Sequence, residues 1–136
     1  GGFSVLKDVP KTIVYQLANH INKNQEIIPK NIITKLPSAE LKPDQFDHDT
    51  LPDYEILDLI IELYIEHKKT FNEIVNNPKI IKNISKEKIL EILTMIDRNE
   101  YKRRQSPPGI KITPLAFGRD RRYPIASDYK YTYRDY

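Results

Sequence analysis

The run SKEKILEILTMIDRNEYKRRQSPPG, residues 85–109, decides the fold of this 136-residue chain. Its apolar side chains recur at the spacing of one helical face, at Ile89, Ile92, Leu93 and Ile96. Ser85 stands where a helix N-cap is expected, and the two prolines near the end cannot continue a helix. The run therefore predicts an amphipathic helix that begins after Ser85, continues into the basic stretch 101–104 and stops before the prolines.

A second amphipathic helix is predicted near the start of the chain, over residues 11–22. Asp8 is its expected cap, and Pro10 suits its first turn. Its inward face is expected to consist of Val14, Leu17, Ala18 and Ile21.

The other segments predict one mostly helical domain. Helices are expected at 53–65 and 70–76, and the stretch 37–52, with three prolines and no apolar period, is expected to be a loop. Residues 32–34 are short and β-branched, so periodicity leaves a strand or one helical turn open. Residues 128–136 contain four tyrosines and are expected to be a tail, ordered only where it docks.

Charge is unevenly spread along the chain. The formal net charge is +3, with +6 on residues 98–136 and −3 on the rest. The basic C-terminal part is therefore expected to face an anion. The absence of cysteine excludes disulfides and thiolate zinc sites and fits a reducing cytoplasm. No apolar run reaches about 20 residues, and no signal peptide precedes the first helix, so a membrane span is not expected.

The strongest candidate for a binding site is the basic end of the long helix. Lys102, Arg103 and Arg104 are adjacent and repel one another unless an anion lies nearby. Three interpretations are open: the cations cap the helix end, pair with the acidic stretch 40–66, or bind a phosphate, carboxylate or nucleic-acid backbone. Tyr101 beside them offers a ring for stacking.

A second basic-aromatic cluster, RDRRY at 119–123, makes a non-catalytic nucleotide- or RNA-binding helical module an alternative. Nine acids at 40–66 would repel a long polyanion, so a small anionic ligand fits the pattern better. A purely structural interaction domain would also explain the helices, because no catalytic triad spacing or glycine-rich phosphate loop occurs in the chain.

Two further features favour an anionic ligand. Lys11 falls in the first turn of its helix, where a cation opposes the dipole unless a ligand phosphate is near. The loop 37–52 could donate a hydroxyl to phosphate and offer carboxylates to a divalent ion, or it could simply be a solvated acidic loop. The loop residues concerned are Ser38, Glu40, Asp47 and Asp49.

Five motifs follow one another along the chain: GGF at 1–3 with LKDVPKTIVY at 6–15, PSAEL at 37–41, QFDHDTLPDY at 45–54, EYKRRQSPPG at 100–109 and FGRDRRYP at 117–124. In this order they resemble the C-terminal part of the synthetase domain of NAD synthetases, of the bacterial glutamine-dependent type. They cover the chain up to about residue 127, so residues 1–127 are assigned to this domain and 128–136 to the tail.

The resemblance implies both a fold and an activity. The intact domain would be an α/β, Rossmann-like domain of the adenine nucleotide hydrolase type, to whose parallel sheet residues 32–34 would add one short strand. The family adenylates deamido-NAD with ATP and Mg2+, and ammonia then displaces AMP to give NAD. This is a cytoplasmic ligase reaction, and the motif at 117–124 favours the glutamine-hydrolysing type.

The resemblance also implies residue roles. Lys11 and Ser38 would contact ATP, and Lys102, with Tyr101 and Phe3, would contact deamido-NAD. The loop that carries Glu40, Asp47 and Asp49 would close over the adenylate and keep water out. No metal ligand is assigned within the chain, because the family's magnesium ligands lie mostly upstream.

Several partners follow from the same resemblance. The family's Ser-Gly-Gly-x-x-Ser pyrophosphate loop is absent from this sequence. The chain is therefore expected to act with the remainder of the synthetase and a glutaminase domain, as a homo-oligomer, without membrane or nucleic acid.

Without that loop, the 136 residues alone are expected to have no synthetase activity. The check is incubation of the isolated chain with deamido-NAD, ATP and ammonia. Any NAD formed would contradict the expectation.

Overall fold

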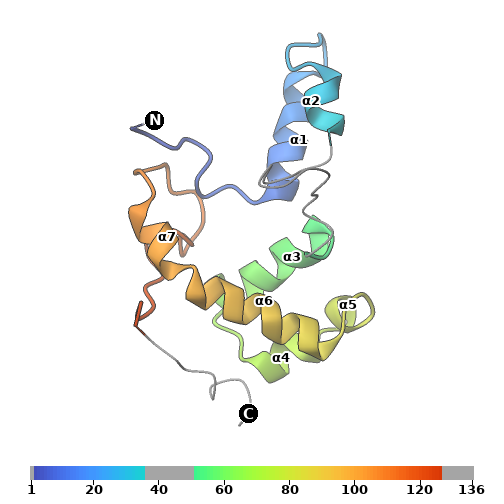
Figure 1. Cartoon of the computed structure of the whole chain (residues 1–136). Helices are drawn as coiled ribbons and strands as arrows, with labels where there is room; N and C mark the ends of the chain where they lie inside the picture. Colours follow the sequence, from blue (N-terminus) through green and yellow to red (C-terminus); the bar gives the residue numbers. More distant parts are fainter. Residues whose placement is uncertain (1, 36–50, 127–136) are drawn as a thin grey trace, which may run out of the picture. The chain divides into compact units, whose positions relative to one another are not determined.

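The computed structural model describes residues 2–35 and 51–126, and within these ranges every regular element is a helix (Figure 1). The chain divides into two compact units, which we describe separately. Gly1–Val9 and Leu59–Tyr136 form the core unit, and Pro10–Asp58 forms the α1 unit. One helix, α3 (Tyr54–Ile61), crosses the division. None of the helices in the described ranges has the length and apolarity that crossing a membrane requires.

The core unit contains all the buried apolar side chains of the described residues. After α3 the chain continues through a π-helical turn, η2 (Glu62–Glu66), and then α4 (Phe71–Val75) and α5 (Pro78–Ile81). The longest helix, α6 (Lys86–Arg98), follows and contacts both α4 and α7 (Glu100–Gln105). The buried side chains are Ile60, Ile65, Ile74, Val75, Ile80, Ile89, Ile92, Leu93, Ile96 and Ala116.

The predicted apolar face of the long helix is therefore confirmed, and so is its cap. Ser85 Oγ accepts a hydrogen bond from the Lys88 N–H at 3.3 Å. The expected helix at 70–76 is α4, which begins in a capping box between Thr70 and Glu73. The short helix α5 was not predicted, because four residues are too few to show a period.

The long helix is interrupted once, at Asn99, between α6 and α7. This residue is both the C-cap of α6 and the N-cap of α7. The helix then stops where the sequence predicts, since Ser106 is extended (φ −74°, ψ 147°) ahead of Pro107. The basic stretch thus occupies the last turn before an extended segment.

The N-terminal segment of the core unit docks against the chain that follows α7. The Ser4 N–H donates to the Pro108 carbonyl at 2.8 Å, and Ser4 forms an isolated parallel bridge with Gly109. Asp8 Oδ2 accepts three hydrogen bonds of 2.8 Å, from the N–H groups of Ile112 and Thr113 and from the Thr113 hydroxyl. The prediction that Asp8 caps the first helix is therefore wrong, because its carboxylate is used by these donors.

The described residues of the α1 unit include α1 (Lys11–Ile21), α2 (Lys30–Thr34) and the start of α3. The predicted helix at 11–22 is confirmed, but its predicted inward face is not buried, since Leu17 and Ile21 are 43% and 46% exposed. The cap of α1 is Pro10, which was expected one position later in the first turn.

Residues 32–34 belong to α2, so of the two conformations that the sequence left open the helical turn is found, and the short strand implied by the resemblance is not. Pro29 stands at the N-cap of this helix with φ −54°, a value suited to entering a helix. Within the described residues no strand lies beside them to pair with. Short β-branched segments take the conformation that their surroundings offer.

The bridge between Ser4 and Gly109 leaves no room for a side chain at Gly109. A Cβ there would collide with the Ser4 carbonyl oxygen and lie 2.7 Å from Lys7 Cβ. We expect Gly109→Ala to lower the free energy of unfolding by roughly 1–3 kcal/mol, as for other overpacked sites. Urea denaturation is the measurement, with Gly2→Ala as control because nothing lies within 4 Å of that position. Equal stability of the two variants would contradict the docking.

Candidate functional site

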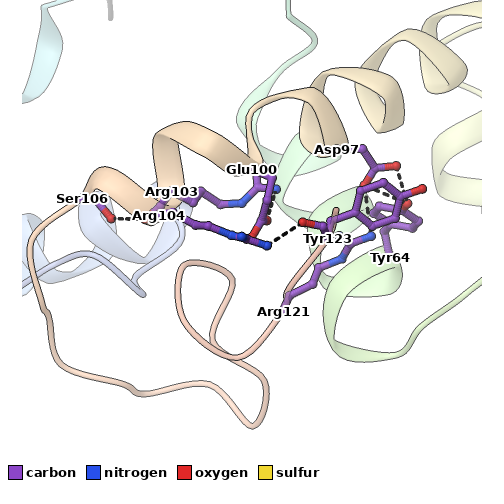
Figure 2. Close-up of polar contacts among 8 residues, drawn as sticks. All are labelled: Tyr64, Asp97, Glu100, Arg103, Arg104, Ser106, Arg121 and Tyr123. Carbon is purple, nitrogen blue, oxygen red and sulfur yellow. Dashed lines mark hydrogen bonds and ion pairs between the residues drawn. The ribbon is translucent and has the colours of Figure 1, made fainter. Parts of the chain in front are cut away.

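The basic end of α7 is organised around one buried carboxylate, that of Glu100 (Figure 2). Glu100 is 1% exposed and stands at the first position of the helix. Arg103 Nη2 donates to Glu100 Oε2 at 2.9 Å, and Arg104 Nε donates to Glu100 Oε1 at 3.0 Å. At least part of the negative charge that the adjacent cations require is therefore supplied by the chain itself, by Glu100 one helical turn earlier.

The ionisation of Glu100 follows from these contacts. Burial raises its pKa, but the hydrogen bonds from Arg104, from Arg103 and from the Tyr123 backbone together outweigh burial, so the pKa lies below its ordinary value. The carboxylate is thus charged at neutral pH and holds both guanidinium groups in place.

Arg103 and Arg104 also hold the chain that follows α7. The guanidinium of Arg103 stacks on the Phe117 ring, 4.5 Å from its centroid. Arg104 Nη2 donates to the Tyr123 carbonyl at 2.8 Å (Figure 2). These two arginines therefore have structural partners. Lys102, the third cation of the basic stretch 101–104, forms no such contact with Glu100 or with the described residues that follow α7.

The second basic cluster is anchored in a similar way, through Arg121 (Figure 2). Arg121 Nη2 donates to Asp97 Oδ1 at 3.1 Å, and the Tyr64 hydroxyl donates to Asp97 Oδ2 at 2.9 Å. The Arg121 guanidinium lies 4.6 Å from the Tyr64 ring centroid and 5.1 Å from that of Tyr123. Only 14% of the Arg121 side chain is exposed, so this cation serves the fold and is not presented to a polyanion.

The residues expected to bind deamido-NAD are all accessible. Tyr101 is 44% exposed, and Lys102 Nζ lies 5.9 Å from the centroid of its ring. Phe3 is 55% exposed and precedes Ser4, which is bridged to Gly109 shortly after α7. The core unit therefore brings together two segments about 100 residues apart that carry these three side chains.

Lys11, expected to bind ATP, lies at the first position of α1 and is exposed. Its Nζ is 5.8 Å from the centroid of the Tyr54 ring, within the α1 unit. The backbone N–H and the hydroxyl of Thr12 donate to Asp58 Oδ2 at 2.9 and 2.8 Å. Asp58 thus supplies an anion to the N-terminus of α1, where the sequence had suggested a ligand phosphate.

The remaining expected site residues, Ser38, Glu40, Asp47 and Asp49, lie outside the described residues. Over residues 2–35 and 51–126, no group of three or more histidine, aspartate or glutamate side chains could hold a metal ion.

The sequence profile described as NAD synthase matches residues 1–106 of the chain. The chain belongs to the NAD synthase family. Curated glutamine-dependent NAD(+) synthetases of Acinetobacter baylyi, Aquifex aeolicus and Thermotoga maritima are 48%, 46% and 46% identical to it and align with 95–96% of its length. The chain spans only 22–24% of the length of these relatives.

One solved structure of this NAD synthase family is also similar. It is described as glutamine-dependent NAD+ synthetase from Acinetobacter baumannii in complex with adenosine diphosphate. The two chains share 42% identity, with 92% of this chain and 20% of the other aligned and a TM-score of 0.48.

The acidic residues that anchor the basic motifs of this chain were not predicted from the sequence. Glu100 could have been found, because it stands three and four residues before Arg103 and Arg104, the spacing of helical ion pairs. No such local signal marks Asp97, since Arg121 and Tyr64 are 24 and 33 residues away. Asp58 likewise contacts Thr12 across 46 residues.

We expect Glu100→Gln to destabilise the chain, because it leaves Arg103 without a charged partner in a mostly buried site. Breaking a buried ion pair costs roughly 3–5 kcal/mol, and we expect the lower end because Arg104 is 38% exposed. Since the folded pKa is lowered, the stabilisation is complete above the ordinary value of 4.5 and is lost as pH falls through the lowered pKa.

Urea denaturation at neutral pH and at acid pH measures both effects. The difference between wild type and Glu100→Gln should shrink as the pH falls below 4.5. Glu91→Gln is the control, since its exposed pair with Lys88 is worth less than about 1 kcal/mol. Equal losses in the two variants would show that Glu100 does not anchor α7.

Proposed function

We propose that this chain forms part of a larger cytoplasmic enzyme that converts deamido-NAD to NAD with ATP and an amide nitrogen from ammonia or glutamine. The observation that carries the proposal is 46–48% identity, over nearly the whole chain, to glutamine-dependent NAD(+) synthetases. The remaining length of those relatives leaves room for the rest of a synthetase domain, a glutaminase domain and the magnesium ligands.

The reaction proceeds in two steps. A carboxylate oxygen of deamido-NAD attacks the α-phosphate of ATP, and pyrophosphate leaves. Ammonia then attacks the acyl carbon of the adenylate, the C–O bond to phosphate breaks, and AMP leaves. Negative charge develops on phosphate oxygens in the first step, so fixed cations at the site lower the barrier.

We assign the binding of deamido-NAD to Lys102, Tyr101 and Phe3. The contacts in the core unit support this division of roles, because Arg103 and Arg104 are held by Glu100 whereas Lys102 is exposed beside an exposed ring. An ammonium group next to an aromatic face suits an anionic substrate that also carries rings.

We assign ATP to Lys11 and Ser38, with Glu40, Asp47 and Asp49 on a loop that closes over the adenylate. The exposure of Lys11 at the start of α1 supports its part. Two exposed apolar side chains of α1, Leu17 and Ile21, support burial against another part of the enzyme or a second copy, as a homo-oligomer or an intact α/β domain would provide.

The alternative of an RNA-binding module has less support. Arg103, Arg104 and Arg121 all pair with carboxylates of the core unit, so they present little charge to a nucleic-acid backbone.

The proposal predicts separate effects on the two substrates in the full-length protein. We expect Lys102→Ala to raise the KM for deamido-NAD about 10–100-fold with little effect on the KM for ATP, since it removes one charge-assisted hydrogen bond. Lys11→Ala should do the reverse. Steady-state kinetics with each substrate varied in turn is the measurement.

Lys82→Ala is the matched control, because Lys82 is an exposed lysine at the end of α5. It should leave both KM values unchanged. An unchanged KM for deamido-NAD in Lys102→Ala would remove the assigned role.

A further inference from the structure

The core unit contains a second feature, a strongly basic cavity. Its volume is about 300 Å³, at the lower end of small-molecule sites. The N-terminal segment, the end of α7 and the chain after it all contribute to its lining, which includes Asp8, Ser106, Gly109 and Gly118. Neither Tyr101 nor Lys102 lines it, so it is separate from the site proposed above.

Positive charge in the lining exceeds the negative charge close to it. Six lining side chains are cationic: Lys7, Arg103, Arg104, Lys111, Arg119 and Arg122. Three carboxylates offset them: Asp8 lines the cavity, Glu100 pairs with Arg103 and Arg104, and Asp120 pairs with Lys111. The formal balance of the described groups is +3, an arrangement that an anion would stabilise.

Several cations of the lining have hydrogen-bond donors without a partner. Arg103 Nε is buried and has no hydrogen-bond partner, which is costly for an N–H group. In the described part of the chain, neither the Arg119 nor the Arg122 guanidinium takes part in a salt bridge or hydrogen bond. Arg119 acts on Asp120 only through its charge, which contributes to the lowered pKa of that carboxyl after the Lys111 hydrogen bond and the Ala116 N–H.

The backbone holds Lys7, one of the six cations, against the wall of the cavity. The stem of Lys7 passes so close to Gly109 and Gly118 that a Cβ at either position would lie 2.7 Å from a Lys7 carbon. Lys7 Nζ donates to the Pro107 carbonyl at 2.8 Å, which fixes the ammonium group and leaves other N–H bonds for a ligand.

We propose that this cavity binds a small, multiply charged phosphate group, carried either by a free ion or by a phosphate ester. Guanidinium groups match phosphate oxygens with paired hydrogen bonds, and an excess of +3 suits an anion with two or more charges better than a single carboxylate. The inference does not depend on the proposed function, since it rests only on the lining of the core unit.

The test is isothermal titration of the full-length protein with inorganic phosphate, pyrophosphate and AMP at low salt. We expect pyrophosphate to bind, and Arg119→Gln/Arg122→Gln to weaken its affinity at least about tenfold, because each lost charged hydrogen bond is worth about that factor. These two arginines make no side-chain hydrogen bond among the described residues, so the variant should fold, which thermal unfolding verifies.

One single variant separates this site from other basic surfaces. Arg98→Gln removes an exposed arginine of α6 outside the cavity and should leave pyrophosphate affinity unchanged. Binding of AMP with the same dependence on Arg119 and Arg122, but not of free anions, would assign the phosphate to an ester. The proposal is overturned if none of the three anions binds, which is the result expected if an acidic segment fills the cavity. It is also overturned if Arg119→Gln/Arg122→Gln binds pyrophosphate with the same affinity as Arg98→Gln.

Discussion

The buried carboxylate of Glu100 is the interaction on which the C-terminal half of this structure depends. It holds Arg103 and Arg104 at 2.9 and 3.0 Å, and these arginines in turn hold Phe117 and the Tyr123 carbonyl. Among residues 106–126 there is no helix, and Ala116 is the one buried apolar residue. Charged hydrogen bonds therefore supply the order that hydrophobic packing does not, and a buried charge can do so only because it is fully paired.

Three other carboxylates hold segments of the chain in the same way. Asp8 accepts three hydrogen bonds from residues 112–113, Asp97 joins Tyr64 to Arg121, and Asp58 receives Thr12 in the α1 unit. The helices of the core unit, by contrast, are joined by an isoleucine-rich core. Two kinds of stabilisation are thus separated along the chain: apolar burial positions the helices, and carboxylates position the segments that carry the candidate binding residues.

This separation explains how much the sequence could predict. Helices such as α1 and α6 were predicted because periodicity and caps are local signals, and Ser85 is an example. The role expected of Asp8 was wrong because its hydrogen-bond partners lie more than 100 residues away along the chain. The segment 32–34 is too short for periodicity to tell a strand from a helical turn. The inward face of α1 was also wrong, because an amphipathic pattern tells which face can be buried and not whether the described chain buries it.

The sequence did not predict how the basic residues divide between structural and available cations. Adjacent basic residues look equivalent in a sequence, yet Arg103, Arg104, Lys111 and Arg121 are paired with carboxylates, while no described salt bridge includes Lys102, Arg119 or Arg122. These three are divided between two places, since Lys102 stands beside Tyr101 and the other two line the basic cavity. A long polyanion needs a continuous row of available charges. Here the available cations lie in two separate places, because internal carboxylates pair with the other basic residues. This arrangement suits compact anions instead.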